Sequence, residues 1–210
     1  MKEQIRKYYE EYKAVFDDNF RLVIELFDKE AIHKMRTAVK RFRVLFQFIG
    51  VLTDAKFKPK KQLKRVRRLF KLGGKIREIQ IEQQIVSEYE QEQKDSLPEY
   101  MEYLRTREFR EISRFLKHLP TLPKREKIIR DDKVTEAIDS IPENEVVVRA
   151  SGFIEAKLIA VSNLLAETPS NHRIHRVRTY LKQIYYLYDQ LETTTDMLVK
   201  LKASKDLRRS

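Results

Sequence analysis

Two segments far apart in this chain carry the same arrangement of basic and apolar residues. Each contains the pattern His-x2-Arg-x3-Lys, and on an α-helix these three positions fall within roughly 60° of one another. Each segment therefore predicts a helix with a stripe of cations, which repels itself unless an anionic partner is bound. The six residues are His33, Arg36, Lys40, His175, Arg178 and Lys182.

The apolar residues of the two segments also share a phase. When the histidine is set at 0°, they fall between about 160° and 260° in both segments, opposite the cations. Each histidine follows a candidate N-cap residue, Asp28 or Ser170, by five positions. The shared phase predicts an internal duplication. The apolar positions are Ile32, Met35, Val39, Phe42 and Phe46, then Ile174, Val177, Leu181, Ile184 and Tyr188.

The chain as a whole has a helical pattern. It has 4 glycines in 210 residues, and its apolar residues recur at spacings of three and four. We expect an all-α fold in which the duplication gives two related helical bundles. A single domain would cover 1–210, with the first helical half in 1–118 and the second in 124–210.

Three local signals refine the expected helices. Gly73 and Gly74 predict a kink or break in the helix that follows Pro59. Ser96 to Glu99 reads as a capping box with a proline at a helix start. A charged helix is expected over 124–140, and the last helical stretch is expected to continue to about Arg209.

The positive charge is concentrated in one window of the sequence. The whole chain has a formal net charge of +12, whereas the window from His33 to Arg77 alone carries sixteen Lys and Arg and a single acid, Asp54. On the helix after Pro59, five cations fall within about 100° of one another, and Arg43 adds to the first stripe. Two such cationic ridges could line a groove for a phosphate chain, although a solvated basic face is the alternative. The five cations are Lys64, Arg67, Arg68, Lys71 and Lys75.

Several classes of protein are disfavoured by what the sequence lacks. The chain has no cysteine, which removes disulfides, thiolate metal sites and cysteine nucleophiles. A phosphate loop fails at Gly74-Lys75, because the first glycine and the Ser/Thr of that motif are missing. His172 and His175 are spaced for a metal, but we find no third ligand. We therefore expect no catalytic residues, no metal, no cofactor and no enzymatic activity; a hydrolase or its accessory subunit would need a metal–carboxylate cluster.

The repeated pattern resembles that of the conserved histidine α-helical domain, or CHAD, family. The first copy matches the family pattern in full, and Leu72 to Ile79 resembles its Leu-Gly-x-x-Arg-Asp segment, with Glu78 in place of Asp. The second copy has Gln183 and Tyr185 where basic residues are usual. The matching residues of the first copy are His33, Arg36, Lys40, Arg41 and Arg43.

The resemblance implies an all-α fold of two pseudo-symmetric antiparallel helical bundles with a basic central groove or cavity. It also implies binding of inorganic polyphosphate. We expect non-catalytic binding through a basic groove lined by the two duplicated helices. The two histidines would donate hydrogen bonds to phosphate, or else fix the helix starts locally. The expected binding residues are His33, Arg36, Lys40, Arg43, Lys64, Arg67, Arg68, Lys71, Lys75, Arg77, His175, Arg178 and Lys182.

Nucleic acid is the alternative partner. Single-strand binders usually place aromatic side chains among their cations, and here Tyr185 alone lies in a basic stripe. That favours a polyphosphate or another phosphate-rich polyanion, although binding to a nucleic-acid backbone stays open. No run of about 18 apolar residues is present, and the start of the chain is unlike a secretory signal. We expect a cytoplasmic protein without a membrane partner, and association with polyphosphate granules follows from the expected ligand.

Overall fold

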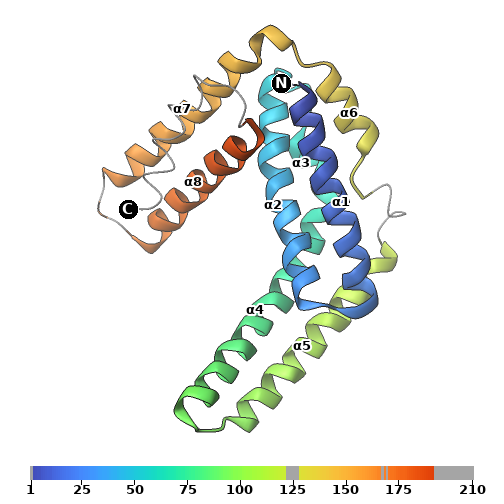
Figure 1. Ribbon diagram of the computed structural model, residues 1–210, viewed down its shortest axis with the longest axis vertical. Helices are drawn as coiled ribbons and strands as arrows, with labels where there is room; N and C mark the ends of the chain where they lie inside the picture. The colour runs from blue at the N-terminus through green and yellow to red at the C-terminus, as the bar shows by residue number, and fades with distance from the viewer. Residues whose placement is uncertain (1, 122–127, 167, 169, 192–210) are drawn as a thin grey trace. The chain divides into compact units, whose positions relative to one another are not determined.

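The computed structural model describes residues 2–121, 128–166, 168 and 170–191, and every regular element in this part of the chain is helical. The predicted all-α class is confirmed. Figure 1 shows the helices. The long helices are α1 (Lys2–Leu26), α2 (Lys29–Leu52), α4 (Lys64–Gln93), α5 (Pro98–His118), α7 (Val146–Leu165) and α8 (Asn171–Leu191). The short elements are α3 (Pro59–Gln62), α6 (Asp131–Asp139) and the 3-10 turns η1 (Leu119–Thr121) and η3 (Glu143–Glu145).

The chain forms two compact units, each made from separate stretches of sequence. Unit 1 contains 1–11, 41–59 and 132–210, and unit 2 contains 12–40 and 60–131. Helices α1 and α2 therefore contribute one part to each unit. The predicted duplication, the central groove and the division into halves 1–118 and 124–210 stay predictions.

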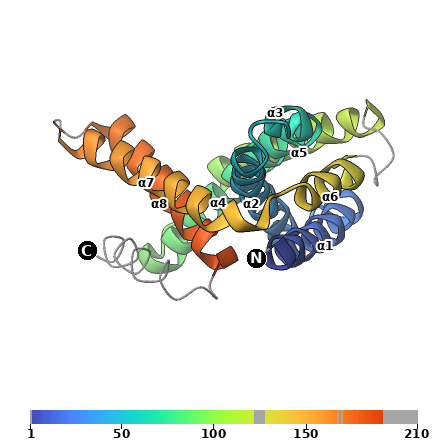
Figure 2. The same cartoon turned by 90° about the horizontal axis from the view of Figure 1, so that it is seen from above.

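Aromatic rings fill the core of unit 1. The ring centroid of Tyr9 lies 5.9 Å from that of Phe42 and 6.2 Å from that of Phe46. Phe57, in the turn after α2, meets Phe46 edge-on at 5.4 Å. Helices α7 and α8 of the same unit pack against each other as an antiparallel pair (Figures 1 and 2).

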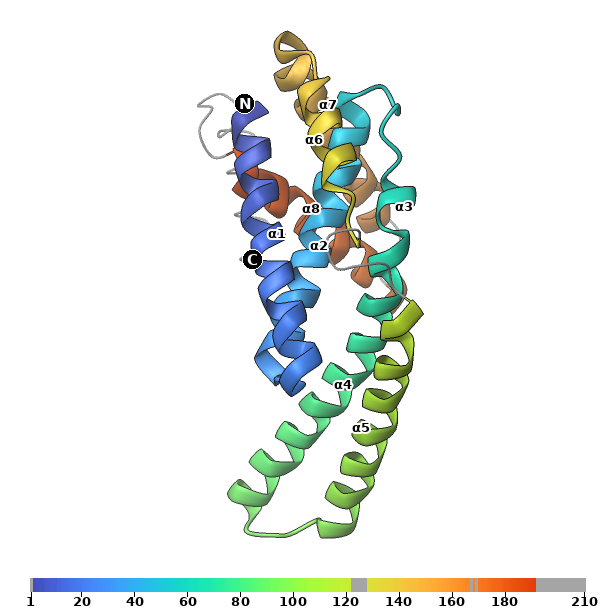
Figure 3. The same ribbon diagram turned by 90° about the vertical axis from the view of Figure 1, so that its right-hand side faces the viewer.

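An antiparallel hairpin of α4 and α5 dominates unit 2 (Figures 1 and 3). Ile79, Val86 and Leu104 are buried between the two helices, and Met101 packs against them. At the other end of α5, the ring of Phe115 meets that of Phe27 edge-on at 5.9 Å. This pairing fixes which faces of α4 and α5 are left for solvent.

Two of the three predicted helix caps are confirmed. The Asp28 carboxylate accepts a hydrogen bond from the backbone N–H of Ala31 at 2.6 Å, at the start of α2. The Ser170 hydroxyl accepts one from the N–H of Arg173 at 3.3 Å, at the start of α8. Such caps satisfy N–H groups that have no partner inside the helix.

Two local predictions were wrong: the break at Gly73 and Gly74, which was the alternative to a kink there, and the capping box at Ser96. Helix α4 runs through Gly73 and Gly74 without a break, and neither glycine has a positive φ. Ser96 does not cap α5: the N-cap residue is Leu97, which has no side-chain cap, and its N–H donates instead to Glu90 at 2.7 Å. The predicted proline at the helix start is confirmed at Pro98.

The second half differs from its predicted pattern in two places. The charged helix expected over 124–140 begins at Asp131 as α6; residues 122–127 lie outside the described part of the chain, as do 192–210. On α8 the apolar face is buried at Ile184, but Ile174 is 55% exposed. All five apolar positions predicted on α2 are buried.

Candidate functional site

The first cationic stripe lies on α2, opposite the buried apolar face of that helix. His33 and Arg43 are exposed, and Arg36 and Lys40 are half-buried. His33, Arg36 and Lys40 belong to unit 2, and Arg43 belongs to unit 1. The predicted phase of the stripe is therefore correct, but two of its four residues are partly withdrawn from solvent.

Arg36 ties α2 to α4 within unit 2. Its Nη1 donates a hydrogen bond to the backbone carbonyl of Phe70, and its guanidinium carbon lies 4.3 Å from the centroid of the Phe70 ring. Burial lowers the pKa of Arg36, while the Glu78 carboxylate acts in the opposite direction. An arginine with a lowered pKa still keeps its charge at neutral pH. Arg36 thus has a packing role that the sequence did not reveal.

The two glycines of α4 make room for this contact. A Cβ at Gly73 would lie 3.3 Å from Cε of Met35, so α2 approaches α4 closely there. A Cβ at Gly74 would collide with the Arg36 guanidinium. Glycine in a helix interior costs about 1 kcal/mol relative to alanine. Here that cost is offset by helix packing, which is why the glycines do not break the helix.

The second cationic ridge lies on α4 in the same unit. All five predicted cations are exposed, as a surface that binds an anion requires. Lys75 Nζ is 3.9 Å from a carboxylate oxygen of Glu111 on α5. Arg77 lies about 160° around α4 from Lys75 and is half-buried, with its Nε buried and without a hydrogen-bond partner among the described residues. Arg77 was predicted as a binding residue, and the helix places it away from the ridge.

The cations of the second repeat lie on α8, within unit 1. His175 and Arg178 are exposed, and Lys182 is half-buried. The ammonium group of Lys157, on the paired helix α7, lies 5.1 Å from the centroid of the Tyr180 ring, and burial lowers the pKa of Lys157. A hydrogen bond from Arg176 lowers the pKa of Tyr180. Two cations outside the motif, Lys157 and Arg176, therefore add positive charge beside this part of α8.

Arg41 has a structural place in unit 1. It donates a hydrogen bond to the Tyr8 hydroxyl at 2.7 Å, and its guanidinium carbon lies 5.7 Å from the Tyr8 ring and 4.8 Å from the Tyr186 ring. It therefore links α1, α2 and α8. The motif placed Arg41 among basic residues, but no spacing in the sequence identifies its two aromatic partners.

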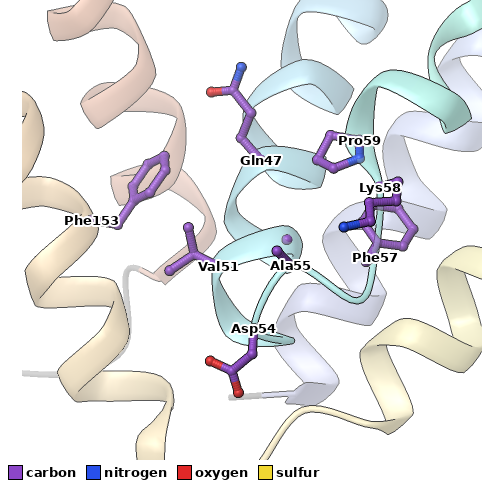
Figure 4. A pocket seen from close by; sticks show the side chains of 9 residues that line it. Gln47, Val51, Asp54, Ala55, Phe57, Lys58, Pro59 and Phe153 are labelled. Atoms are coloured by element: carbon purple, nitrogen blue, oxygen red, sulfur yellow. The ribbon is translucent and has the colours of Figure 1, made fainter.

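A pocket of about 690 Å³ opens in unit 1 beside the turn that follows α2 (Figure 4). Phe153 contributes from α7, and Asp54 lies at the pocket and is paired with Arg149. None of the residues that line the pocket was predicted as a binding residue. Its lining residues are Gln47, Gly50, Val51, Asp54, Ala55, Phe57, Lys58, Pro59 and Phe153.

The described residues contain neither a candidate membrane span nor a candidate metal cluster. No helix among them is long and apolar enough to span a membrane. No group of three or more His, Asp or Glu side chains in the described ranges is placed to hold a metal ion.

In the described part of the chain, the fold is all-helical and cationic side chains are exposed on α2, α4 and α8. The model of the CHAD domain family matches residues 7–209, so this chain belongs to that family, which is linked to polyphosphate binding. No curated protein and no solved structure matches the chain significantly.

Proposed function

We propose that this protein binds inorganic polyphosphate, without turning it over, through the exposed cations of α2 and α4 in unit 2. The observation that carries the proposal is the ridge on α4, where five Lys and Arg side chains are exposed along one side of a helix. Polyphosphate has about one negative charge per phosphate and no bases. Lysine and arginine donors are therefore sufficient to bind it, and arginine adds forked hydrogen bonds to phosphate oxygens.

The cations of unit 2 have different tasks in this proposal. The exposed side chains of α4, together with His33 on α2, contact the phosphates directly. Arg36 acts mainly as a positioning residue, because its bond to Phe70 and its place over Gly74 hold α2 against α4. Lys40, half-buried, adds positive charge at the end of the stripe.

The stripe of α8 is a second, weaker anion-binding surface in unit 1. His175, Arg178 and Lys182 supply its charge. The positions that are basic in the first repeat are Gln183 and Tyr185 here, which leaves fewer donors. We expect substitutions in α8 to weaken polyphosphate binding less than equivalent substitutions in α4.

The absence of turnover is a proposal from the sequence. The chain contains no cysteine nucleophile, no phosphate loop and no serine in a nucleophile-elbow motif. Incubation with polyphosphate and Mg²⁺ or Mn²⁺ should release no orthophosphate above a buffer control. Metal-dependent release that disappears when a pair of carboxylates is mutated would contradict this proposal.

The direct test compares three polyanions in one buffer: long-chain polyphosphate, single-stranded RNA and duplex DNA. We expect polyphosphate to bind most tightly at about 150 mM salt, with an affinity that falls steeply as salt rises, because binding releases counterions. The substitution pair Arg67→Ala/Lys71→Ala should weaken polyphosphate binding about tenfold and reduce the log–log salt slope by about 1 to 2.

A matched control removes two charges from the far end of the α4–α5 hairpin. The hairpin-tip control is Lys94→Asn/Arg105→Ala; asparagine suits the left-handed backbone of Lys94, whose φ is 53°. If this control weakens binding as much as the α4 pair does, the ridge is not a site and only net charge matters. An affinity that does not change with salt would contradict the electrostatic mechanism.

One observation favours the alternative, binding of single-stranded nucleic acid. Tyr100 and Tyr103 on α5 are exposed, and their rings stack with centroids 6.0 Å apart. Exposed aromatic rings near cations suit base stacking. RNA that binds as tightly as polyphosphate, and loses affinity on Tyr100→Ala/Tyr103→Ala, would establish this alternative in place of polyphosphate.

A further inference from the structure

A third row of cations lies on α5, where the sequence analysis selected no residue. Arg107, Arg110, Arg114 and Lys117 fall within about 80° of one another around this helix. The last three are exposed, and Arg107 is half-buried. Four cations on one side of a helix in unit 2 add to the positive charge that the same unit carries on α4.

Contacts across the hairpin show which edge this row occupies. Arg107 Nη1 lies 2.9 Å from a carboxylate oxygen of Glu82, and Glu111 lies 3.9 Å from Lys75. Lys75 and Glu82 are seven residues apart, so they lie on the same side of α4, about 20° from each other. The row on α5 and the ridge on α4 therefore border the same edge of the hairpin.

The opposite edge of the hairpin has a different chemistry. There the amides of Gln80 and Gln83 donate to the two carboxylate oxygens of Glu108 at 2.8 and 2.9 Å. Arg105 lies about 160° around α5 from Arg107, away from the cationic row. The packing of α4 against α5 therefore brings the two groups of cations to one edge of the hairpin.

Two of the acidic groups on the cationic edge, Glu111 and Glu82, are paired with cations. Glu111 is largely buried and contacts both Arg114 and Lys75. Glu82 is paired with Arg107. Arg110 and Lys117 are the other two cations of the row, and both are exposed beside the α4 ridge. The contacts that the structure gives include no acidic neighbour for either of them.

We infer that the polyphosphate-binding surface continues from α4 across the hairpin onto α5, with Arg110 and Lys117 as additional phosphate ligands and Arg114 held between them by Glu111. This inference rests on the proposed function. Packed helices lie about 8–10 Å apart, and the ridge from Lys64 to Lys75 is about 16 Å long. Long polyphosphate chains can contact both helices at once, whereas a short oligophosphate contacts few of these cations.

The test substitutes the two exposed cations and leaves the Arg114–Glu111 pair intact. Arg110→Ala/Lys117→Ala should weaken the binding of long-chain polyphosphate about tenfold and reduce the log–log salt slope by about 1 to 2. The same substitutions should weaken tripolyphosphate binding by less than about threefold. Circular dichroism and thermal melts check that this variant and the hairpin-tip control keep the wild-type fold.

The hairpin-tip control, Lys94→Asn/Arg105→Ala, removes the same number of charges from the same hairpin. It should leave the affinity for long-chain polyphosphate within about twofold of wild type. The inference is overturned if the α5 variant binds like wild type, or if the α5 variant and the control lose affinity equally. A wild-type protein that fails to bind polyphosphate at all would instead refute the proposed function, and the inference with it.

Discussion

The guanidinium of Arg36 occupies the space over Gly74 that a side chain at that position would fill. From this place it donates to the carbonyl of Phe70 and lies against the Phe70 ring. A residue that the motif presents as a phosphate ligand is therefore also part of the contact between α2 and α4.

A double-mutant cycle between Arg36 and Gly74 should show strong coupling. Gly74→Ala alone gains about 1 kcal/mol of helix propensity but displaces Arg36, whose charge-assisted bond contributes about 1.5–3 kcal/mol, so we expect net destabilisation. In an Arg36→Ala background the clash is gone, and the same substitution should stabilise the protein by up to about 1 kcal/mol. Urea unfolding of the four proteins measures the cycle. Equal effects of Gly74→Ala in both backgrounds would contradict the contact.

The backbone conformation of Phe27 predicts that a glycine variant is more stable than an alanine variant at this position. Its φ is 49°, in the left-handed region that favours glycine. Phe27→Gly and Phe27→Ala both lose the ring contact with Phe115, but glycine should leave the protein about 1 kcal/mol more stable than alanine. At Leu26, the last residue of α1, the order should be reversed, because alanine is the better helix former. Urea midpoints of the four variants test both orders.

His118 should make stability depend on pH. Burial, and to a lesser extent Arg68, lowers the pKa of His118 below its ordinary value of 6.5. The unfolded chain therefore takes up a proton at a higher pH than the folded chain does. The contribution of His118 to the free energy of unfolding is complete above about pH 6.5 and is lost as the pH falls below that value.

The measurement is urea unfolding at pH 7.5 and pH 5. Wild type should lose more stability between these values than His118→Gln does. One of the two exposed histidines of α8 supplies the control, since His172→Gln should behave like wild type. If His118→Gln lost as much stability between pH 7.5 and pH 5 as wild type does, another group would cause the pH dependence.

Asp54 and Arg149 form an ion pair in unit 1, and the effect of this pair on the pKa of Asp54 can be measured directly. Both guanidinium Nη groups of Arg149 donate to the Asp54 carboxylate, and this hydrogen bonding lowers the pKa of Asp54. Arg149→Met should therefore raise the pKa of Asp54 towards its ordinary value of 3.8. Carboxyl carbon NMR shifts followed between pH 2 and 7 measure this change.

The control for that titration is Arg178→Met, which removes one positive charge from an exposed position on α8. It should leave the pKa of Asp54 close to its wild-type value. If both variants raise the pKa equally, the lowered value reflects the overall positive charge and the specific pair contributes little.

Much of the local structure follows from the sequence because it depends on neighbours in the chain. The spacing of apolar residues predicted helices, and Asp28 and Ser170 were identified as caps because a cap binds N–H groups of its own first turn. The phase of a helix also fixes which residues share a face. The cations of α4 could therefore be placed on one ridge without a structure.

Tertiary packing decided what each face meets, which no local pattern encodes. Gly73 and Gly74 read as a break because glycine is a poor helix former, yet α2 packs against them and the helix continues. Arg36 read as a free cation because nothing in the sequence connects it to Phe70. The cationic row of α5 becomes part of the same surface as the α4 ridge only when antiparallel pairing sets Glu111 beside Lys75. The sequence by itself determined the helices and their charged faces; the packing of distant segments determined which of those charges support the fold and which are exposed to a ligand.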